Sequence, residues 1–336
     1  MMRQRSSTSG RASGDFTVSA ETFESLPDPV QVPGNELEWA SPFVLPGWLH
    51  AWWEVFAPPA EPLILSVREG GRLIGIAPLQ REGSSLRLIG GADVCDHLDV
   101  VVDPRRKKEF CGSLLDYLSR EGVTRIELGP VRSDSAVMTG LVPQARGRGW
   151  PVASETEDVL FEADLPPSWE EYLDRLTGKQ RHEVRRKLRR LQQSVTFAFR
   201  MVGGRGDIDA GMEDFLRLFR MNRADKAEFM TARMEAFFRA LARRVPATRL
   251  GFLDVDGATA AAVMCFDHGA TRYLYNSAFD SGLGSLSVGI LCKILSIQDA
   301  ISRGLAKYDF LKGNETYKRQ LGGRAVPVYH CRIETA

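Results

Sequence analysis

The stretch from Tyr273 to Lys318 decides the fold of this chain. It reads YLYNSAF (273–279), DSGLGSLSVG (280–289), ILCKILSIQDAISRG (290–304) and LAKYDFLKGNETYK (305–318). These patterns predict a strand, a Gly/Ser-rich loop, a helix, a second strand and a short polar turn, in that order. Such an order can place a phosphate-holding helix start beside two strand ends, where a carbonyl could react.

The Gly/Ser-rich loop over 280–289 leads into an apolar helix. Its small residues leave backbone N–H groups exposed at the helix start, and the helix dipole adds partial positive charge there. A pyrophosphate would fit this position, although the loop is neither a Walker loop nor a Rossmann fingerprint. The alternative is a plain connection in which Ser287 is the N-cap.

A polar cluster follows the second strand of this stretch. Asp309 alternates with Tyr308 and Phe310, so its carboxylate could point inward, where it would need a partner such as Lys318. The predicted position, at the end of a strand, favours a cleft over a core. The alternative is a structural ion pair. The cluster contains Asp309, Gly313, Asn314, Glu315, Tyr317 and Lys318.

A strongly basic helix is predicted upstream, in KQRHEVRRKLRRL (179–191). Val184, Leu188 and Leu191 recur at helical spacing, so one stripe is buried and the rest is positive. This helix could bind the phosphates of a nucleotide, a tRNA or an anionic lipid. Alternatively it is a solvated face, neutralised by acidic neighbours. The acidic neighbours are Glu170, Glu171 and Asp174.

Smaller candidates for substrate binding lie elsewhere. Asp96 and His97 could line a substrate cleft, or they could form an ordinary loop–strand junction. Lys226 is a further substrate candidate; the alternative is that it caps a helix end. The five histidines show no HExxH or HxH pairing and the five cysteines no CxxC spacing, so no metal site is expected.

Length and composition limit the class of protein. A chain of 336 residues with 43% hydrophobic and 26% charged residues predicts about two ordinary globular domains. The formal net charge of +1 gives no overall attraction to nucleic acid or membrane. Scattered cysteines fit a reducing, cytoplasmic compartment. No apolar run approaches the roughly 18–20 residues that span a bilayer, and we expect a disordered tail over residues 1–15.

Short helices and meandering strands alternate along both halves of the chain, which predicts an α+β architecture. Pro166-Pro167 marks a natural boundary because two prolines continue neither a helix nor a central strand. We therefore expect an N-terminal domain over 16–165 and a C-terminal domain over 166–336. The second domain opens with Ser168 and Glu171 at capping-box spacing.

Four stretches together resemble a known family. They are PFVLPGWLHAWWEVF (42–56) with a hairpin ending APLQ, the basic KQRHEVRRKLRRL, NRADKAEF (222–229), and SVGILCKILSIQDAISRG (287–304) followed by YDFLKGNETYKRQLGG. The chain resembles the CelD-type, cellulose-biosynthesis-associated branch of the GNAT acyltransferases, which is similar to the Fem aminoacyl transferases. The likeness covers nearly the whole chain beyond the tail.

The resemblance implies two tandem GNAT-like domains with mixed, mostly antiparallel sheets flanked by helices. It places Ser287, Val288 and Gly289 at a pyrophosphate-binding helix start, with Tyr275 and Asn276 on the strand beside the acyl group. It implies catalytic roles for the polar cluster after the second strand. The implied catalytic residues are Asp309, Glu315, Tyr317 and Lys318.

The GNAT signature Q/R-x-x-G-x-G/A is not met, because the loop offers Gly282, Gly284 and Gly289 instead. The expected donor is acetyl-CoA or another acyl-CoA, and the acceptor is an amine or hydroxyl of a small molecule or saccharide, in exopolysaccharide or cell-envelope biosynthesis. One alternative is a Fem-like transferase that takes its acyl group from aminoacyl-tRNA bound by the basic helix over 179–190. Another is a non-catalytic GNAT-fold binding module.

Overall fold

The computed structural model describes residues 10–11, 16–27, 36–91, 93–204, 207–221 and 229–335. The chain divides into two compact units. Unit 1 comprises Met1–Asp158 and Pro327–Ala336, and unit 2 comprises Val159–Val326. The boundary predicted at Pro166 thus lies seven residues after the start of unit 2, and the last ten residues belong to unit 1. Of the expected tail, only residues 10–11 are described; they form the short strand β1, Gly10–Arg11.

Unit 1 is a sheet with helices and one parallel strand pair. The described sheet runs in the order β1, β2, β3, β4, β5, β7 and β14 (Arg324–Glu334), and only β5 and β7 pair in parallel among these strands. Its elements are β2 (Phe16–Glu21), α1 (Pro46–Phe56), β3 (Glu61–Glu69), β4 (Arg72–Glu82), β5 (Ser85–Leu88), β6 (Val101–Val102), α2 (Lys107–Arg120), β7 (Arg125–Arg132), η3 (Val137–Leu141) and α3 (Val142–Gly147).

Unit 2 repeats this strand order, with β12 in the place of the shorter β5. Its sheet runs β8, β13, β12, β11, β10, β9, and β12 and β13 are its parallel pair. Its elements are α4 (Trp169–Arg175), α5 (Gly178–Ser194), β9 (Phe197–Val202), α6 (Asp207–Met221), α8 (Ala232–Arg244), β10 (Thr248–Val255), β11 (Ala258–His268), β12 (Thr271–Phe279), η4 (Ser281–Leu286), α9 (Val288–Ser302), β13 (Lys307–Lys312) and α10 (Thr316–Gln320).

Two strands contribute residues to both units. β8 (Val152–Asp164) ends beside β13 in unit 2, and β14 (Arg324–Glu334) ends beside β7 in unit 1. Each unit therefore completes its sheet with a strand that crosses the unit boundary. The double proline at Pro166-Pro167 follows β8 and ends that strand, but it does not separate the units.

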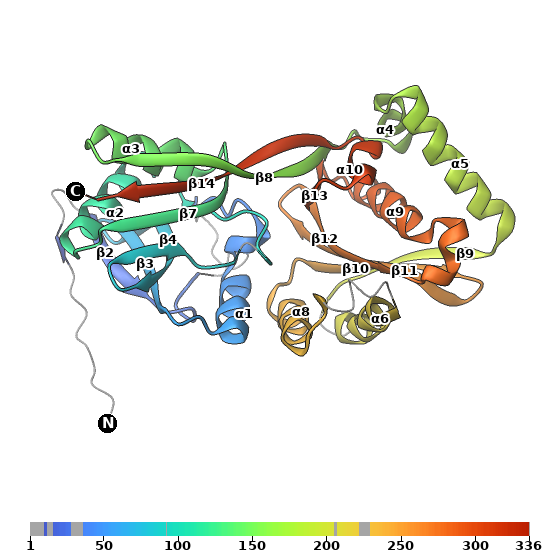
Figure 1. Cartoon of the computed structure of the whole chain (residues 1–336), viewed down its shortest axis with the longest axis horizontal. Coiled ribbons are helices and arrows are strands. Elements are labelled where there is room, and N and C mark those ends of the chain that lie inside the picture. Colours follow the sequence, from blue (N-terminus) through green and yellow to red (C-terminus); the bar gives the residue numbers. More distant parts are fainter. Residues whose placement is uncertain are drawn as a thin grey trace. The chain divides into compact units, whose positions relative to one another are not determined.

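Helices cover both faces of the unit 2 sheet. α6 and α8 lie on one face, and α9 lies on the other with α4 and α5 beyond it (Figure 1). This mixed sheet flanked by helices confirms the predicted fold class. Within the part of the chain that the structure describes, no helix is both long and apolar enough to cross a membrane.

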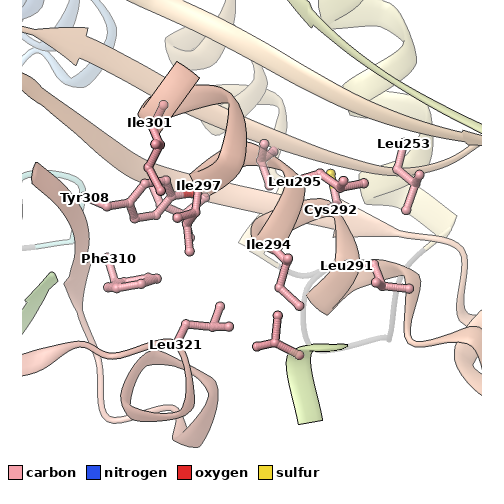
Figure 2. Packing of buried hydrophobic residues seen from close by; sticks show 14 of the residues in the cluster. Leu253, Leu291, Cys292, Ile294, Leu295, Ile297, Ile301, Tyr308, Phe310 and Leu321 are labelled. Carbon is pink, nitrogen blue, oxygen red and sulfur yellow. The ribbon is translucent and has the colours of Figure 1, made fainter. Parts of the chain in front are cut away.

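Helix α9 is apolar on nearly all sides, which is typical of a helix enclosed by its own domain. Ile297 and Ile301 of α9 lie beside Tyr308 of β13 in the core cluster of unit 2 (Figure 2). Because the buried residues of α9 extend around the helix, neighbouring elements fix its position on both sides. The start of α9 is thereby held at a defined place relative to the strand ends.

The basic segment forms a helix of its own, separate from α4. Ser168 caps α4 by accepting a hydrogen bond from the Glu171 N–H at 3.2 Å, as its spacing predicted. The chain then turns at Leu176, and Thr177 with Gln180 forms a complete capping box that starts α5. Ser168 and Thr177 each accept a hydrogen bond from a helix-start N–H group. The second cap starts a new helix after Leu176, so the segment forms two helices and not one.

Candidate functional site

The parallel strands β12 and β13 separate part-way along their length. They pair at only three positions, Thr271 with Lys307, Arg272 with Tyr308 and Tyr273 with Asp309. Beyond these positions β12 stays with β11 as far as Phe279, and β13 stays with β8 as far as Lys312. The sheet therefore opens after Tyr273 and Asp309, at the carboxyl ends of two parallel strands, where α/β proteins commonly bind ligands.

A β-bulge follows the separation point on each strand. The register of β12 with β11 skips Tyr275, because Met264 faces Asn276 while Cys265 faces Leu274. The register of β13 with β8 shifts between Asp309 and Leu311, and Leu311 adopts a left-handed φ of 60°. Bulges bend a strand and redirect its backbone groups. Both strands are therefore redirected where the opening begins.

The start of α9 carries free backbone donors. The N–H groups of Ile290 and Leu291 both donate to the Ser287 carbonyl at 3.0 Å. Among the described residues, the N–H groups of Val288 and Gly289 have no backbone acceptor. Two orphan donors on a helix of fifteen residues, with its dipole behind them, form an anion-binding position.

Gly289 has a packing reason to be glycine. A Cβ placed on it would lie 2.9 Å from Cδ1 and 3.1 Å from Cγ of Phe279, the last residue of β12. The first turn of α9 thus lies directly against the end of β12. Ser287 occupies the N-cap position with φ 60° and ψ 35°, yet its hydroxyl makes no capping hydrogen bond. Ser287 is therefore the N-cap residue of α9, as the alternative predicted, but it caps the helix by position and not through its hydroxyl.

The basic helix meets this position directly. Lys187 of α5 places its Nζ 3.1 Å from the Ser287 Oγ and 3.2 Å from Glu183 Oε1. Its side chain is 19% exposed. Hydrogen bonds from Arg186 and Lys187, together with their charge, lower the pKa of Glu183 to about 2. The phosphate-loop candidate and the basic-helix candidate therefore lie together, and Lys187 places a cation at the helix start.

The rest of the basic helix is only partly neutralised. Arg181 pairs with Asp174 at 2.8 Å, and Arg185 pairs with Glu170 at 3.2 Å. Glu171 instead accepts a hydrogen bond from Ser168. In the described parts of the chain, no carboxylate lies within ion-pair distance of three exposed cations on α5. These three are Lys179, Arg189 and Arg190.

The polar cluster after β13 is organised around Lys318. This side chain is buried, and its Nζ donates to the carbonyls of Leu311 (3.0 Å) and Lys312 and pairs with Glu315 Oε2 at 3.1 Å. Lys318 therefore does not pair with Asp309, the partner that the sequence suggested. Its contacts tie α10 back to the end of β13 and hold the turn that carries the exposed Glu315.

Asp309 and Tyr317 have different surroundings. Asp309 is buried at the separation point, and its Oδ1 accepts a hydrogen bond from the Leu311 N–H at 2.8 Å. Tyr317 is half-buried, and the Lys293 ammonium lies 4.9 Å from its ring centroid. Burial raises the pKa of Tyr317. The Tyr317 phenol thus stays protonated through the physiological range, as a proton donor must.

The side chains of Tyr275 and Asn276, which the resemblance places on the strand beside the acyl group, are engaged in local contacts. The Tyr275 ring packs against Phe238 and Phe266, with centroids 5.5 and 5.4 Å away. The Asn276 Oδ1 accepts from the N–H of Ser277 at 2.8 Å. Since the side chains have these local contacts, the backbone at the bulge is the part of this segment that could face an acyl group.

The three predicted substrate-binding residues, Asp96, His97 and Lys226, lie far in the sequence from the polar cluster after β13. In unit 1, His97 is buried with its ring edge-on to Phe43 at 5.1 Å, and Asp96 is half-buried. Lys226 lies outside the described residues. No group of three or more His, Cys, Asp or Glu side chains suited to a metal occurs in the described ranges.

Sequence reasoning missed two lysines of the site. Lys187 was one of many cations on a basic helix, and nothing local singles it out, because its contact lies a hundred residues further along the chain. Lys293 carried a stronger signal, as the only charged residue in the apolar run from Val288 to Gln298. It is buried, and its Nζ donates to the Gly289 carbonyl at 3.2 Å.

Comparison with protein families finds a similarity in the second half of the chain. Residues 178–319 match the acetyltransferase (GNAT) domain family. This stretch begins with α5 and ends within α10. The stretch similar to this family therefore contains Lys187, the start of α9, the separating strands and the polar turn. It carries the acyltransferase fold that the sequence resemblance implied, while the CelD-type branch remains a prediction.

Solved structures share the fold at low sequence identity. FemX is 11% identical with a TM-score of 0.60, covering 86% of this chain and 91% of that chain. The C-terminal domain of a protein assigned as a lysylphosphatidylglycerol synthetase from Agrobacterium fabrum is 11% identical with a TM-score of 0.57, covering 86% of this chain and 91% of that chain. L-PGS from Bacillus licheniformis is 10% identical with a TM-score of 0.55, covering 84% of this chain and 90% of that chain. A search of curated proteins gives no significant match.

Proposed function

We propose that this chain is a GNAT-type acyltransferase that moves an acyl group, acetyl in the simplest case, from acyl-CoA to an amine or hydroxyl. The observation that supports it best is the separation of β12 from β13 after Tyr273 and Asp309, with the free N–H groups of Val288 and Gly289 at the start of the connecting helix. This arrangement offers a slot for a thioester and a cradle for a diphosphate within one GNAT domain.

In the proposed reaction, the acceptor nitrogen or oxygen attacks the thioester carbonyl directly. A bond forms between the acceptor atom and the carbonyl carbon, the carbon–sulfur bond breaks, and CoA leaves as a thiolate that takes a proton. The protein would supply proximity, worth up to about 7–11 kcal/mol in ideal cases. Backbone N–H groups at the Tyr275 bulge and Asn276 would stabilise the developing oxyanion. Ser287, Val288, Gly289 and Lys187 would hold the diphosphate.

The proton-transfer roles follow from exposure and hydrogen bonding. We assign the base to the exposed Glu315 or to the buried Asp309, directly or through a water. We assign the acid for the thiolate to Tyr317, whose pKa is raised by burial. Lys318 is a positioning residue in this scheme, because its ammonium is engaged by two carbonyls and Glu315.

The proposed acceptor is a small molecule or saccharide, as in exopolysaccharide or cell-envelope synthesis. This part of the proposal rests on the CelD-type resemblance. The proposed acceptor-binding groups are Asp96, His97 and Lys226. Asp96 is half-buried and His97 is buried, so Asp96 is the more accessible of these two.

Calorimetric titration of the full chain with acetyl-CoA, longer acyl-CoAs and tRNA, each at two salt concentrations, tests the donor. Micromolar binding of an acyl-CoA supports the proposal. Thiol release in the presence of amino sugars then tests transfer to an acceptor. A chain that binds no acyl-CoA at either salt concentration contradicts the CoA-dependent assignment.

A second candidate function is supported by the unpaired cations on α5. Fem-type transferases, which the sequence resembles, use aminoacyl-tRNA, and Lys179, Arg189 and Arg190 are free to meet a phosphate backbone. Such binding should weaken steeply as salt rises, because each neutralised phosphate releases counterions. tRNA binding with that salt dependence, lost when Arg189 and Arg190 are both replaced by Ala, would favour this candidate over the first.

A further inference from the structure

A second polar pocket lies at the other end of α9. It has a volume of about 330 Å³ and is formed by the end of β9, the start of β10 and the C-cap of α9. Because α9 has fifteen residues and rises about 1.5 Å per residue, this pocket lies roughly 20 Å from the helix start. It is therefore distinct from the proposed donor site. Its lining residues are Met201, Gly203, Gly204, Pro246, Arg249 and Arg303.

Its two arginines are the ends of a five-membered chain of charges. Arg249 Nε lies 3.7 Å from Asp267 Oδ2, and Asp267 holds the fully buried Arg272 with contacts of 2.7 and 2.8 Å. Arg272 Nη1 also lies 2.8 Å from Asp299 Oδ2, and the same oxygen accepts from Arg303 Nε at 2.8 Å. Three arginines and two aspartates alternate, so this network of five charges carries one excess positive charge. Both of its end residues, Arg249 and Arg303, line the pocket.

Guanidinium donors at both ends remain available for a ligand. Arg249 uses Nη1 for the carbonyls of Pro246 and Thr248, each at 2.8 Å. Within the described residues, Arg249 Nη2 and both Nη atoms of Arg303 have no acceptor. Asp299 holds Arg303 through a hydrogen bond from Nε, and the two carbonyls hold Arg249 through Nη1, so the free donors of both guanidinium groups are partly pre-oriented. A pair of such forks matches the oxygens of a tetrahedral dianion.

Gly203 keeps the pocket in this form. A Cβ on Gly203 would lie 2.7 Å from Cδ and 3.0 Å from Nε of Arg249. Any side chain there would push the guanidinium away from the end of β9. The missing side chain therefore lets Arg249 lie across the backbone and present its fork to the pocket.

We propose that this pocket binds a phosphate dianion, either inorganic phosphate or the phosphoryl group of a monoester, between Arg249 and Arg303. The excess positive charge of the network favours an anion, and the free donors on two converging arginines favour one with several oxygens. The site takes no part in the proposed acyl transfer.

The test measures thermal unfolding of the full chain in increasing inorganic phosphate and, separately, glycerol phosphate, at ionic strength held constant with chloride. A ligand that binds only the native state raises the unfolding midpoint along a saturable curve. Arg303→Ala should shift that curve to about tenfold higher ligand concentration or more, since it removes a charge-assisted fork. Arg303→Lys should weaken binding less. Arg217→Ala, an exposed charge deletion on α6, should behave as the wild type.

Saturation with both ligands identifies the phosphoryl group as the recognised feature, and saturation with glycerol phosphate alone identifies a monoester. If Arg303→Ala fails to fold, Gly203→Ala provides the second variant, and it should lose the saturable response by displacing Arg249. A wild-type midpoint that rises only linearly with both ligands overturns the proposal. Saturation that is unchanged in both pocket variants also overturns it.

Discussion

The Lys187 ammonium nitrogen lies 3.1 Å from the Ser287 hydroxyl, so a cation from the basic helix touches the residue that starts α9. Glu183, one helical turn before Lys187, holds the same ammonium at 3.2 Å. A diphosphate carries more negative charge than the neutral Ser287 hydroxyl or the single Glu183 carboxylate, so it should attract the Lys187 ammonium more strongly. Donor binding should therefore draw Lys187 from these partners onto a phosphate oxygen.

Replacement of Lys187 by Ala should weaken acyl-CoA binding about tenfold or more, because a charge-assisted hydrogen bond contributes about 1.5–3 kcal/mol. Calorimetric titration measures the change. Arg189→Ala is the matched control, since Arg189 is an exposed α5 cation with no ion-pair partner among the described residues. Equal affinities for the two variants would show that α5 does not reach the donor.

Replacement of Gly289 by Ala should disturb the donor site from within the helix. The new Cβ would lie 2.9 Å from the Phe279 ring, so the first turn of α9 must move away from β12. Such overpacking costs about 1–3 kcal/mol of unfolding free energy, and we expect acyl-CoA affinity to fall with it. Gly284→Ala is the control, because a Cβ there meets nothing within 4 Å. Wild-type affinity in Gly289→Ala would place the diphosphate elsewhere.

The local part of the site could be predicted from the sequence. The Gly/Ser-rich run before Ile290, the apolar helix and the short strand around Asp309 are each set by neighbouring residues, and the structure forms all three. Contacts between distant residues carry no local signal. Lys187 reaches Ser287 across a hundred positions, and β8 and β14 complete sheets on the other side of a unit boundary.

Lys318 shows how a local pattern can mislead. Strict alternation along β13 suggested that Asp309 points inward and needs the lysine. The bulge after Asp309 and the left-handed Leu311 change the direction of the chain, and Gly313 turns it with φ 107°. Lys318 then returns to the carbonyls at the end of its own strand. Side-chain periodicity cannot anticipate a bulge, because the extra residue breaks the period on which the prediction rests.

Replacement of Lys318 by Met should lower stability more than it alters chemistry. The buried carbonyl of Leu311 and the half-buried carbonyl of Lys312 would lose their donor, at a cost of about 2–4 kcal/mol in unfolding free energy. Denaturant unfolding measures the loss. Glu315→Gln should leave stability nearly unchanged, because Glu315 is exposed. If Lys318→Met kept wild-type stability yet lost turnover, Lys318 would be catalytic and the positioning role would be wrong.

Asp99 of unit 1 should make stability depend on pH. Its oxygens accept from the N–H groups of Val100, Ala136 and Val137 at 2.8–3.0 Å, and burial raises its pKa to about 6 from an ordinary value of 3.8. The native state then holds a proton that the unfolded state has released, so stability falls as pH rises from about 4 to about 6 and is level above that. The fall is at most about 3 kcal/mol.

Asp99→Asn removes this titration, so the difference in unfolding free energy between the wild type and Asp99→Asn should shrink over the same pH window. Asp93→Asn, at an exposed position in the same loop region, should keep the wild-type slope. Parallel pH profiles for the wild type and Asp99→Asn would show that this carboxyl does not titrate there.

Replacement of Tyr317 by Phe separates packing from chemistry at the proposed acid. The ring keeps its edge-on contact with Phe310, with centroids 6.3 Å apart, and its place beneath the Lys293 ammonium, so the unfolding midpoint should hardly change. Loss of the hydroxyl should lower kcat about a hundredfold if it protonates the leaving thiolate, with acyl-CoA affinity unchanged. Steady-state turnover and calorimetry on the same preparation measure the two quantities.

Because burial raises the pKa of Tyr317, the wild-type rate should show no loss of this acid through neutral pH. An aromatic donor substrate whose thiolate needs no proton, such as an acylated nitrothiophenol, should restore most of the rate. A Tyr317→Phe protein that is equally slow with that substrate would assign the hydroxyl to acceptor positioning instead of proton donation.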